Sequence, residues 1–222
     1  MSYCYIISQT AVRLIERRGD VIKVANPIHV EERKREIALK AASLFIKHGY
    51  IQTSMRDIAR ECSISVGTIY HYIHSKDDIL SLFQEITSSE LEKFAHERLN
   101  VLRKGRPTEA ISDAIDAIIS FIDSTQDMTV FWYQEARNLN PQQTEALIRR
   151  EDLEVKLLKN ILQWGCETGD FEINDVDLAA HNIIVLCDMW AFRRWALRKD
   201  YTLDRYKKEQ TAFILSRFKP HR

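Results

Sequence analysis

The side chains best suited to binding another molecule lie within residues 53–76, TSMRDIARECSISVGTIYHYIHSK. Apolar residues recur at helical spacing on both sides of a short polar break, which predicts a helix, a turn and a second helix. We expect Thr53 to cap the first helix and Ser65 to cap the second. Ile69 and Ile73, four residues apart, should point inward. This pattern predicts a helix-turn-helix unit, whose second helix reads base edges in the major groove of DNA.

The outward face of the second helix combines small, hydroxyl and aromatic groups. The missing side chain of Gly67 lets the backbone approach nucleic acid, and Thr68 offers a methyl and a hydroxyl to a base edge. Arg56, on the first helix, is able to make a bidentate contact with guanine, and Lys76 supplies a cation for a phosphate. The candidate DNA-binding residues are Ser54, Arg56, Ser65, Val66, Gly67, Thr68, Tyr70, His71, Tyr72 and Lys76.

Charge is distributed unevenly along the chain. The 222 residues carry a formal net charge of zero, so attraction to DNA must be local. Residues 30–76 hold eight Lys and Arg against five Asp and Glu, a net charge of +3, and the remainder is slightly acidic. The apolar fraction of 45% is sufficient for a buried core.

Helical periodicity continues through the rest of the chain, and no strand pattern competes with it. A helix from about Glu31 to His48 should complete a three-helix core, and a long helix should begin after a cap at Ser75. Further helices are expected at residues 108–123, 128–139, 142–165, 176–198 and 203–218. The fold class is therefore all-α.

The N-terminal half resembles the tetracycline-repressor (TetR) family of bacterial transcription regulators. The resemblance spans Gly49-Tyr50, residues 53–59, residues 66–73 and residues 75–80, in the family's order; Ile73 stands where the family often has Phe. It implies an extension at residues 1–28, a helix-turn-helix DNA-binding domain at 29–76, and a helical ligand-binding and dimerisation domain at 77–222. It also implies a regulator that acts as a homodimer on a palindromic double-stranded DNA operator in the cytoplasm.

Two aromatic stretches of the C-terminal part are candidates for an effector pocket, because aromatic walls with a few charges suit an apolar ligand with an anionic head. They also suit core or dimer packing, which on sequence alone is the favoured interpretation. The candidate ligand-binding residues are Trp132, Tyr133, Arg137, Trp190, Arg193 and Arg194.

The same stretches, with residues 165–171, resemble the branch of the family that senses acyl-coenzyme A. This resemblance implies an acyl-CoA effector that releases a repressor from DNA, its phosphates held by Arg137, Arg193 and Arg194. A planar or cationic drug-like effector, held by aromatics and Glu135, is the alternative. The apolar stripes of the last two helices predict homodimerisation through those helices.

Other classes of protein are less well supported. No HExxH, GxSxG or glycine-rich phosphate loop is present, so we expect no enzyme, cofactor or metal site. The four cysteines form no CxxC pair, and buried structural thiols are favoured over a redox switch at Cys187. No segment is apolar enough for a membrane span, and no export signal is expected.

Residues 8–18 predict a short amphipathic helix or a loosely attached extension, with a basic arm as a further option. A helical protein-binding adaptor without DNA-reading function remains the last alternative.

Overall fold

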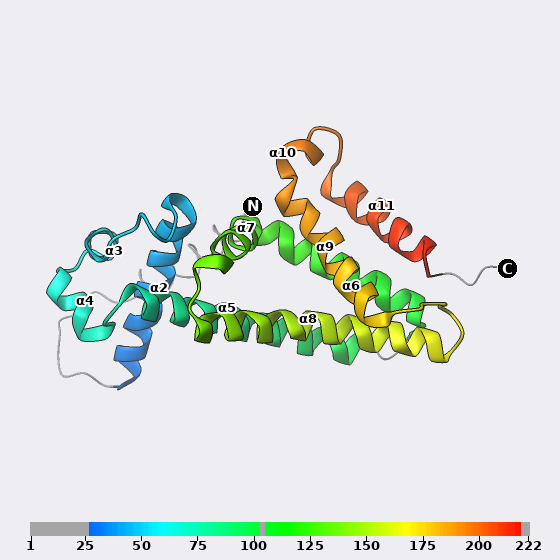
Figure 1. Ribbon diagram of the computed structural model, residues 1–222, viewed down its shortest axis with the longest axis horizontal. Helices are drawn as coiled ribbons and strands as arrows, with labels where there is room; N and C mark the ends of the chain where they lie inside the picture. The colour runs from blue at the N-terminus through cyan, green and yellow to red at the C-terminus, as the bar shows by residue number, and fades with distance from the viewer. Residues whose placement is uncertain (1–26, 103–104, 219–222) are drawn as a thin grey trace. The chain divides into compact units, whose positions relative to one another are not determined.

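The computed structural model describes residues 27–102 and 105–218, with side chains described for residues 29–89 and 105–218. Within these residues the chain is helical and contains no strand, so the all-α prediction is confirmed (Figure 1). The predicted helix at residues 8–18 lies outside the described residues. The helices are α2 (Pro27–His48), α3 (Met55–Glu61), α4 (Val66–Tyr72), α5 (Lys76–Leu102), α6 (Pro107–Ser124), α7 (Gln126–Glu135), η1 (Ala136–Asn138), α8 (Pro141–Glu167), α9 (Val176–Phe192), α10 (Arg194–Leu197) and α11 (Leu203–Ser216).

Three predicted boundaries were wrong. The first helix starts at Pro27 rather than Glu31, because proline is compatible with the first turn, where its missing N–H is not needed. The helix predicted over residues 128–139 ends at Glu135 and continues as a 3₁₀ turn. The helix predicted over 176–198 breaks at Arg193, whose backbone (φ −113°, ψ 21°) is not helical.

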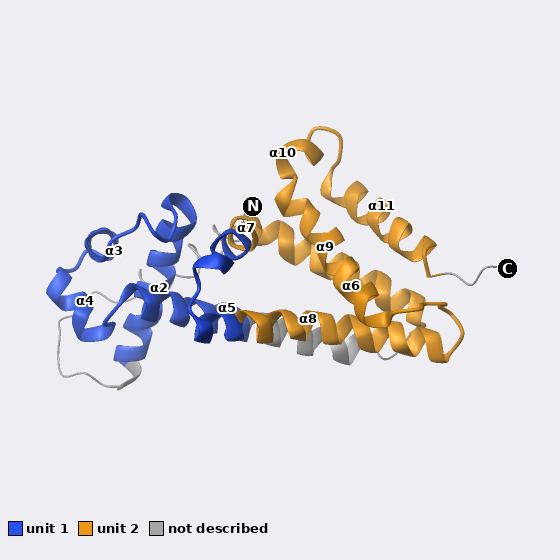
Figure 2. Ribbon diagram, in the orientation of Figure 1, with its two compact units in different colours: residues 1–89, 131–146 blue, residues 90–130, 147–222 orange. Residues whose placement is uncertain are grey.

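The chain forms two compact units, and neither is continuous in sequence (Figure 2). Unit 1 contains residues up to 89 and residues 131–146; unit 2 contains residues 90–130 and 147–222. Helices α5 and α8 therefore each begin in unit 1 and continue into unit 2. The segment 131–146 leaves unit 2 and returns to it, so unit 1 receives a second covalent connection besides α5.

The core of unit 1 is built by α2, α3, α4 and the start of α5. Its fully buried side chains lie at helical spacing, as the sequence predicts, and include Ile37, Phe45, Ile58, Ile69, Ile79, Leu80 and Phe83. Segment 131–146 adds aromatic packing: the ring of Phe131 stacks on Phe45, with centroids 6.5 Å apart, and Trp132 stacks on Phe83 at 5.4 Å.

Unit 2 has its own hydrophobic core, in which α6 packs against α9 and α11 and the apolar stripe of α8 completes the cluster. Gly165 on α8 is required there, because a Cβ at this position would lie 2.0 Å from the ring of Phe171. The thiol of Cys187 is buried in this core and that of Cys62 in unit 1. Burial raises the pKa of Cys62 to about 11 and raises that of Cys187 further, which disfavours reactive thiolates at both positions.

Candidate DNA-reading surface and effector-binding residues

The helix α3 is capped by Ser54, and not by Thr53 as predicted. The Ser54 hydroxyl accepts the backbone N–H of Asp57 at 3.2 Å, while the Asp57 carboxylate accepts the backbone N–H of Ser54 at 3.1 Å. This reciprocal capping box satisfies two N–H groups that the helix start leaves without partners. Thr53 is instead buried, and its hydroxyl donates to the carbonyl of Gly49.

The predicted cap of α4 is confirmed. The Ser65 hydroxyl accepts the backbone N–H of Thr68 at 2.9 Å and lies 2.7 Å from the Thr68 hydroxyl. The turn before it is closed by a hydrogen bond from the N–H of Ile64 to the carbonyl of Ala59, and Ser63 adopts a left-handed backbone (φ 55°). These local contacts fix where α4 starts relative to α3.

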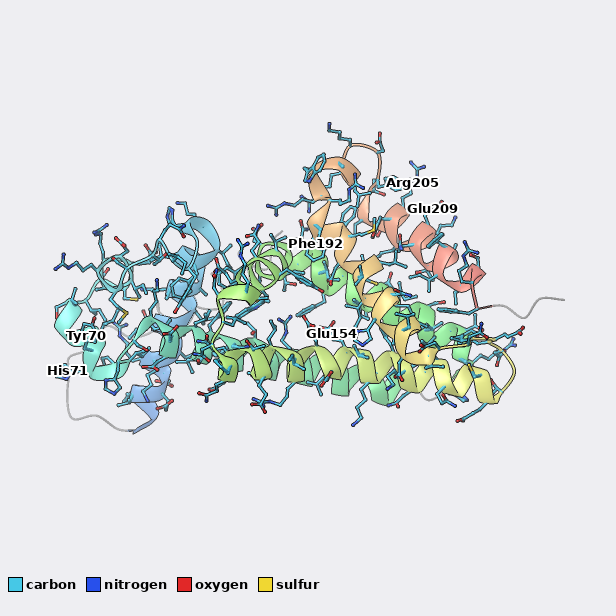
Figure 3. All side chains as sticks on the ribbon, viewed as in Figure 1. Tyr70, His71, Glu154, Phe192, Arg205 and Glu209 are labelled. Atoms are coloured by element: carbon cyan, nitrogen blue, oxygen red, sulfur yellow. The ribbon has the colours of Figure 1, made fainter. Side chains whose placement is uncertain are left out.

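Helix α4 has one buried face, and other residues of the helix are exposed. Ile69 and Ile73 are buried, as predicted, whereas Tyr70 is 46% exposed and His71 is exposed. Figure 3 shows Tyr70 and His71 on the outer side of α4. Val66, Thr68 and Tyr72 are half-buried. Among the predicted DNA-binding side chains of α4, those of Tyr70 and His71 are the exposed ones, and a DNA-binding role for the set stays a prediction.

Gly67 is exposed on the same helix, and packing within the protein does not explain the absence of a side chain there. A Cβ at position 67 would meet only the Ser65 hydroxyl oxygen, at an ordinary distance of 3.7 Å. The backbone there is therefore open to an external molecule, which fits the predicted close approach of DNA. Arg56 on α3 is exposed and forms no ion pair within the described residues, so its guanidinium is available for an external acceptor.

Lys76 has a role that the sequence did not reveal. Its ammonium donates to the backbone carbonyls of Tyr50 at 2.6 Å, Thr53 at 2.9 Å and Ile51 at 3.3 Å. It also lies 4.3 Å from the centroid of the Tyr50 ring, and partial burial lowers its pKa. All three N–H bonds have internal acceptors, so the structure favours a positioning role for Lys76 over a phosphate contact.

Tyr50 and segment 131–146 connect the reading helices to the rest of unit 1. The Tyr50 hydroxyl donates to Asp77 at 2.5 Å, and its backbone N–H points to Glu135 at 3.4 Å. The amide of Gln143 donates to the carbonyl of Asp77 and the hydroxyl of Ser81. The buried amide of Gln84 donates to the carbonyl of Gln143 at 2.8 Å. These polar contacts fix segment 131–146 against α5.

The six predicted ligand-binding residues do not form one cluster within either unit. In unit 1 Trp132 is buried against Phe83, Tyr133 is 46% exposed, and Arg137 is exposed on η1. The packing of Trp132 is that of a core residue, which was the favoured alternative. Its ring N–H has no hydrogen-bond partner among the residues that the structure describes.

In unit 2, Trp190 is also a core residue. Its ring N–H donates to Asp123 at 2.7 Å, and its ring lies 4.9 Å from that of Tyr206. Arg194 pairs with Asp127, and Arg193 lies over the exposed ring of Trp195 at the break between α9 and α10. Both arginines are exposed, so a phosphate-binding role for them stays a prediction.

Two half-buried charged residues of unit 2 were missed by sequence reasoning. Arg150 and Glu154 lie one turn apart on α8, in the stripe that continues through the buried Leu158 and Ile161. Their i, i+4 spacing with those residues was the signal that could have found them. Within the described residues, no group of three or more His, Cys, Asp or Glu side chains could hold a metal ion.

The fold and the accessible face of α4 define a helix-turn-helix DNA-binding protein. Comparison with known proteins agrees: residues 37–82 match the model of bacterial regulatory proteins of the tetR family, and residues 104–195 match a tetracyclin repressor-like C-terminal domain. The chain belongs to the TetR family of transcriptional regulators. Among the described residues no helix has the length and apolar character that crossing a membrane requires.

Two relatives illustrate the similarity. The HTH-type transcriptional regulator HbdR of Aromatoleum sp. (strain CIB) is 28% identical over 197 residues, which cover 88% of this chain and 84% of HbdR. The HTH-type transcriptional repressor KstR2 of Mycobacterium tuberculosis is 28% identical over 169 residues, 75% of this chain and 82% of KstR2. These relatives are transcriptional regulators, and this chain is a regulator rather than an enzyme.

Solved structures share the fold. The ketosteroid transcriptional regulator KstR2 of M. tuberculosis superposes with a TM-score of 0.69 at 22% identity, over 90% of this chain and 98% of that one. FadR of Bacillus subtilis, solved in complex with stearoyl-CoA, has a TM-score of 0.66 at 22% identity, over 81% of this chain and 96% of that one.

Proposed function

We propose that the protein is a homodimeric transcriptional repressor that leaves a palindromic operator when an acyl-CoA binds. Residues 29–76 would read DNA, and residues 77–222 would bind the effector and dimerise, in the cytoplasm. The observation that carries the DNA-reading part is the accessible surface of α4, with Gly67 open and Tyr70 and His71 directed outward. The acyl-CoA part is supported by the stearoyl-CoA complex of FadR, which has the same fold.

Dimerisation through α9 and α11 is supported by apolar side chains that each helix leaves exposed. Leu178 and Val185 on α9 are 57% and 53% exposed, and Phe213 on α11 is 51% exposed. Other residues of the apolar stripes in these helices lie in the core of unit 2 instead, namely Ile183, Trp190, Tyr206 and Ile214. A second copy would cover the exposed set, and its two-fold symmetry would place two α4 helices on one palindrome.

Two covalent routes would carry the effector signal from unit 2 to the reading head. The first is α5, which begins in unit 1 and continues into unit 2. The second is segment 131–146, fixed to α5 by Gln143 and to the α2 aromatic core by Phe131. A ligand that binds one conformation of unit 2 more tightly than another would move α5 and segment 131–146. In the dimer, this movement would change the separation of the two DNA-reading helix-turn-helix units.

The test is binding of the purified protein to the DNA upstream of its own gene, measured by fluorescence anisotropy. Long-chain acyl-CoA, the free fatty acid and coenzyme A are added separately. Release by the acyl-CoA alone supports the proposed effector. Release by a planar cationic compound instead supports the drug-like alternative, and the lack of any salt-dependent specific binding supports the adaptor.

A further inference from the structure

A carboxylate lies at the C-terminal end of α6, where the helix dipole disfavours it. Asp123 is in the last turn of α6, and that turn carries no basic residue. The last carbonyls of a helix have no intrahelical partner and give this end a partial negative charge. An acidic side chain there needs compensation from elsewhere in the fold, and the hydrogen bonds of Asp123 show its source.

Asp123 accepts hydrogen bonds from three other parts of unit 2. Its Oδ1 accepts the indole N–H of Trp190 on α9 at 2.7 Å and the amide of Gln126 on α7 at 2.7 Å. The guanidinium of Arg198, just after α10, donates to the same oxygen at 3.3 Å and lies over the ring of Trp190. Trp190 and Gln126 are buried, so their donors depend on this carboxylate rather than on water.

The same contacts fix the first turn of α7. The Gln126 amide also donates to the backbone carbonyl of Asp123 at 2.7 Å, and Asp127 forms an ion pair with Arg194 on α10. Asp123 and Asp127 are four residues apart, and their partners on α9 and α10 repeat at the same interval. These contacts of residues 123–127 with residues 190–198 form an anchor for α7 in unit 2.

The other end of α7 belongs to unit 1, as the colour change within this helix in Figure 2 shows. There Phe131 stacks on Phe45, and the carboxylate of Glu135 accepts the backbone N–H of Tyr50 at 3.4 Å. A single hydrogen-bonded helix is a rigid element that carries a change at its first turn to its last. The anchor in unit 2 therefore bears on residues that pack against the reading head.

We propose that Asp123 is a positioning residue for DNA binding, because it holds the start of α7 and thereby the α7 residues that contact the core of unit 1. The anchor is the point at which a change in unit 2 reaches α7. It gives Trp190 and Arg194, both in the second aromatic stretch, a positioning role. The proposal rests on the proposed function for its effect on DNA, whereas the anchor itself is tested without DNA.

The experiment uses the full-length variants Asp123→Ala, Asp123→Asn and Arg194→Gln, with Tyr206→Phe as the matched control. The Tyr206 hydroxyl donates to the carbonyl of Leu186 at 2.7 Å, so the control removes one hydrogen bond from the same core and no donor to Asp123. For each variant we would measure the melting temperature, amide hydrogen exchange of the free protein, and affinity for the DNA upstream of its own gene.

Asp123→Ala should speed exchange of the amides of residues 129–135 about tenfold or more, because the first turn of α7 loses hydrogen bonds to a charged acceptor. Exchange at residues 49–53, which Glu135 contacts, should also rise. Operator affinity should fall about fivefold or more, as is usual for coupling between two sites.

The other variants separate positioning from stability. Asp123→Asn keeps an acceptor oxygen and should restore exchange and affinity to within about threefold of the wild-type values. Arg194→Gln, at an exposed position, removes only the ion pair with Asp127 and should act in the same direction by up to about fivefold. Tyr206→Phe should lower the melting temperature but leave exchange in α7 and operator affinity unchanged.

Equal acceleration of exchange throughout unit 2 in Asp123→Ala and Tyr206→Phe would show that Asp123 only stabilises the core, and would overturn the proposal. Faster exchange in α7 with unchanged operator affinity would also overturn it, because α7 would then not control the reading head. If the wild-type protein shows no specific, salt-dependent DNA binding, the proposed function fails separately. In that case exchange at residues 49–53 decides, and unchanged rates there in Asp123→Ala would refute the link from the anchor to the reading head.

Discussion

Measurements on the Lys76→Met variant would distinguish two roles for this lysine, positioning of the backbone and direct contact with DNA. The substitution keeps most of the apolar stem and removes the ammonium that donates to the carbonyls of Tyr50, Ile51 and Thr53. These carbonyls belong to the chain between α2 and α3, so the ammonium ties that connection to the first residue of α5. Without it, the reading helices lose one of the contacts that fix their position.

The magnitude follows from the bonds that are lost. Hydrogen bonds to a charged donor contribute about 1.5–3 kcal/mol each when buried. Two of the three are short, and the side chain is only half-buried, so water partly replaces them. The contact with the Tyr50 ring adds about 0.5–1 kcal/mol. We expect a total loss of about 2–4 kcal/mol, which corresponds to a fall of about 5–15 °C in the melting temperature of a chain of this size.

Calorimetry and operator binding at several salt concentrations check this expectation. Lys47→Met, which removes an exposed cation from α2, is the control for charge. Sequence reasoning alone assigned Lys76 to a phosphate, in which case the slope of log affinity against log salt should fall by about one. The structure instead predicts a lower melting temperature with an unchanged slope. An unchanged melting temperature with a slope reduced by about one would refute the positioning role.

Three further substitutions test other contacts. Gln143→Ala removes three side-chain hydrogen bonds, so it should lower the free energy of unfolding by about 1–3 kcal/mol and weaken effector-induced release from DNA. Gln142→Ala, at an exposed position, is the control and should change neither quantity. Equal denaturation midpoints for the two variants would contradict the role of Gln143. Gly165→Ala forces a Cβ into the ring of Phe171 and should lower the free energy of unfolding by about 3 kcal/mol, measured with urea; a neutral result would show that the ring can move. Arg56→Ala should leave the melting temperature unchanged and relax base choice at one operator position by about 1–3 kcal/mol; an equal loss on all sequences would show that it touches only the backbone.

Much of the reading head could be predicted from the sequence because its signals are local. The cap at Ser65 and the inward pair Ile69 and Ile73 depend on spacing within a few residues, and all three are confirmed. The cap of α3 was misplaced by one residue. Adjacent Thr53 and Ser54 are both good caps. The capping box of Ser54 with Asp57, and the hydrogen bond from the Thr53 hydroxyl to Gly49, distinguish them in the structure.

The effector-binding half was less predictable, since helical periodicity shows which residues share a face but not which face meets a partner. On sequence alone, Trp132 and Trp190 suited both a pocket wall and core packing, with packing favoured. Their contacts with Phe83 and Tyr206, both distant in sequence, show that they are core residues. Gln143 illustrates the same limit, because its partner Asp77 lies 66 residues away.

By itself, the sequence determined the all-α class, the order of the helices and the presence of a helix-turn-helix unit, because caps and apolar periods act over one or two turns. Tertiary contacts determined that Lys76 holds backbone carbonyls together, that the two indoles are core residues, and that the buried Nε–H of Arg150 has no acceptor among the described residues. These features depend on which helix faces pack together and on which polar groups then lack a hydrogen-bond partner. Contacts between residues far apart in the chain determine them, so local sequence patterns do not reveal them.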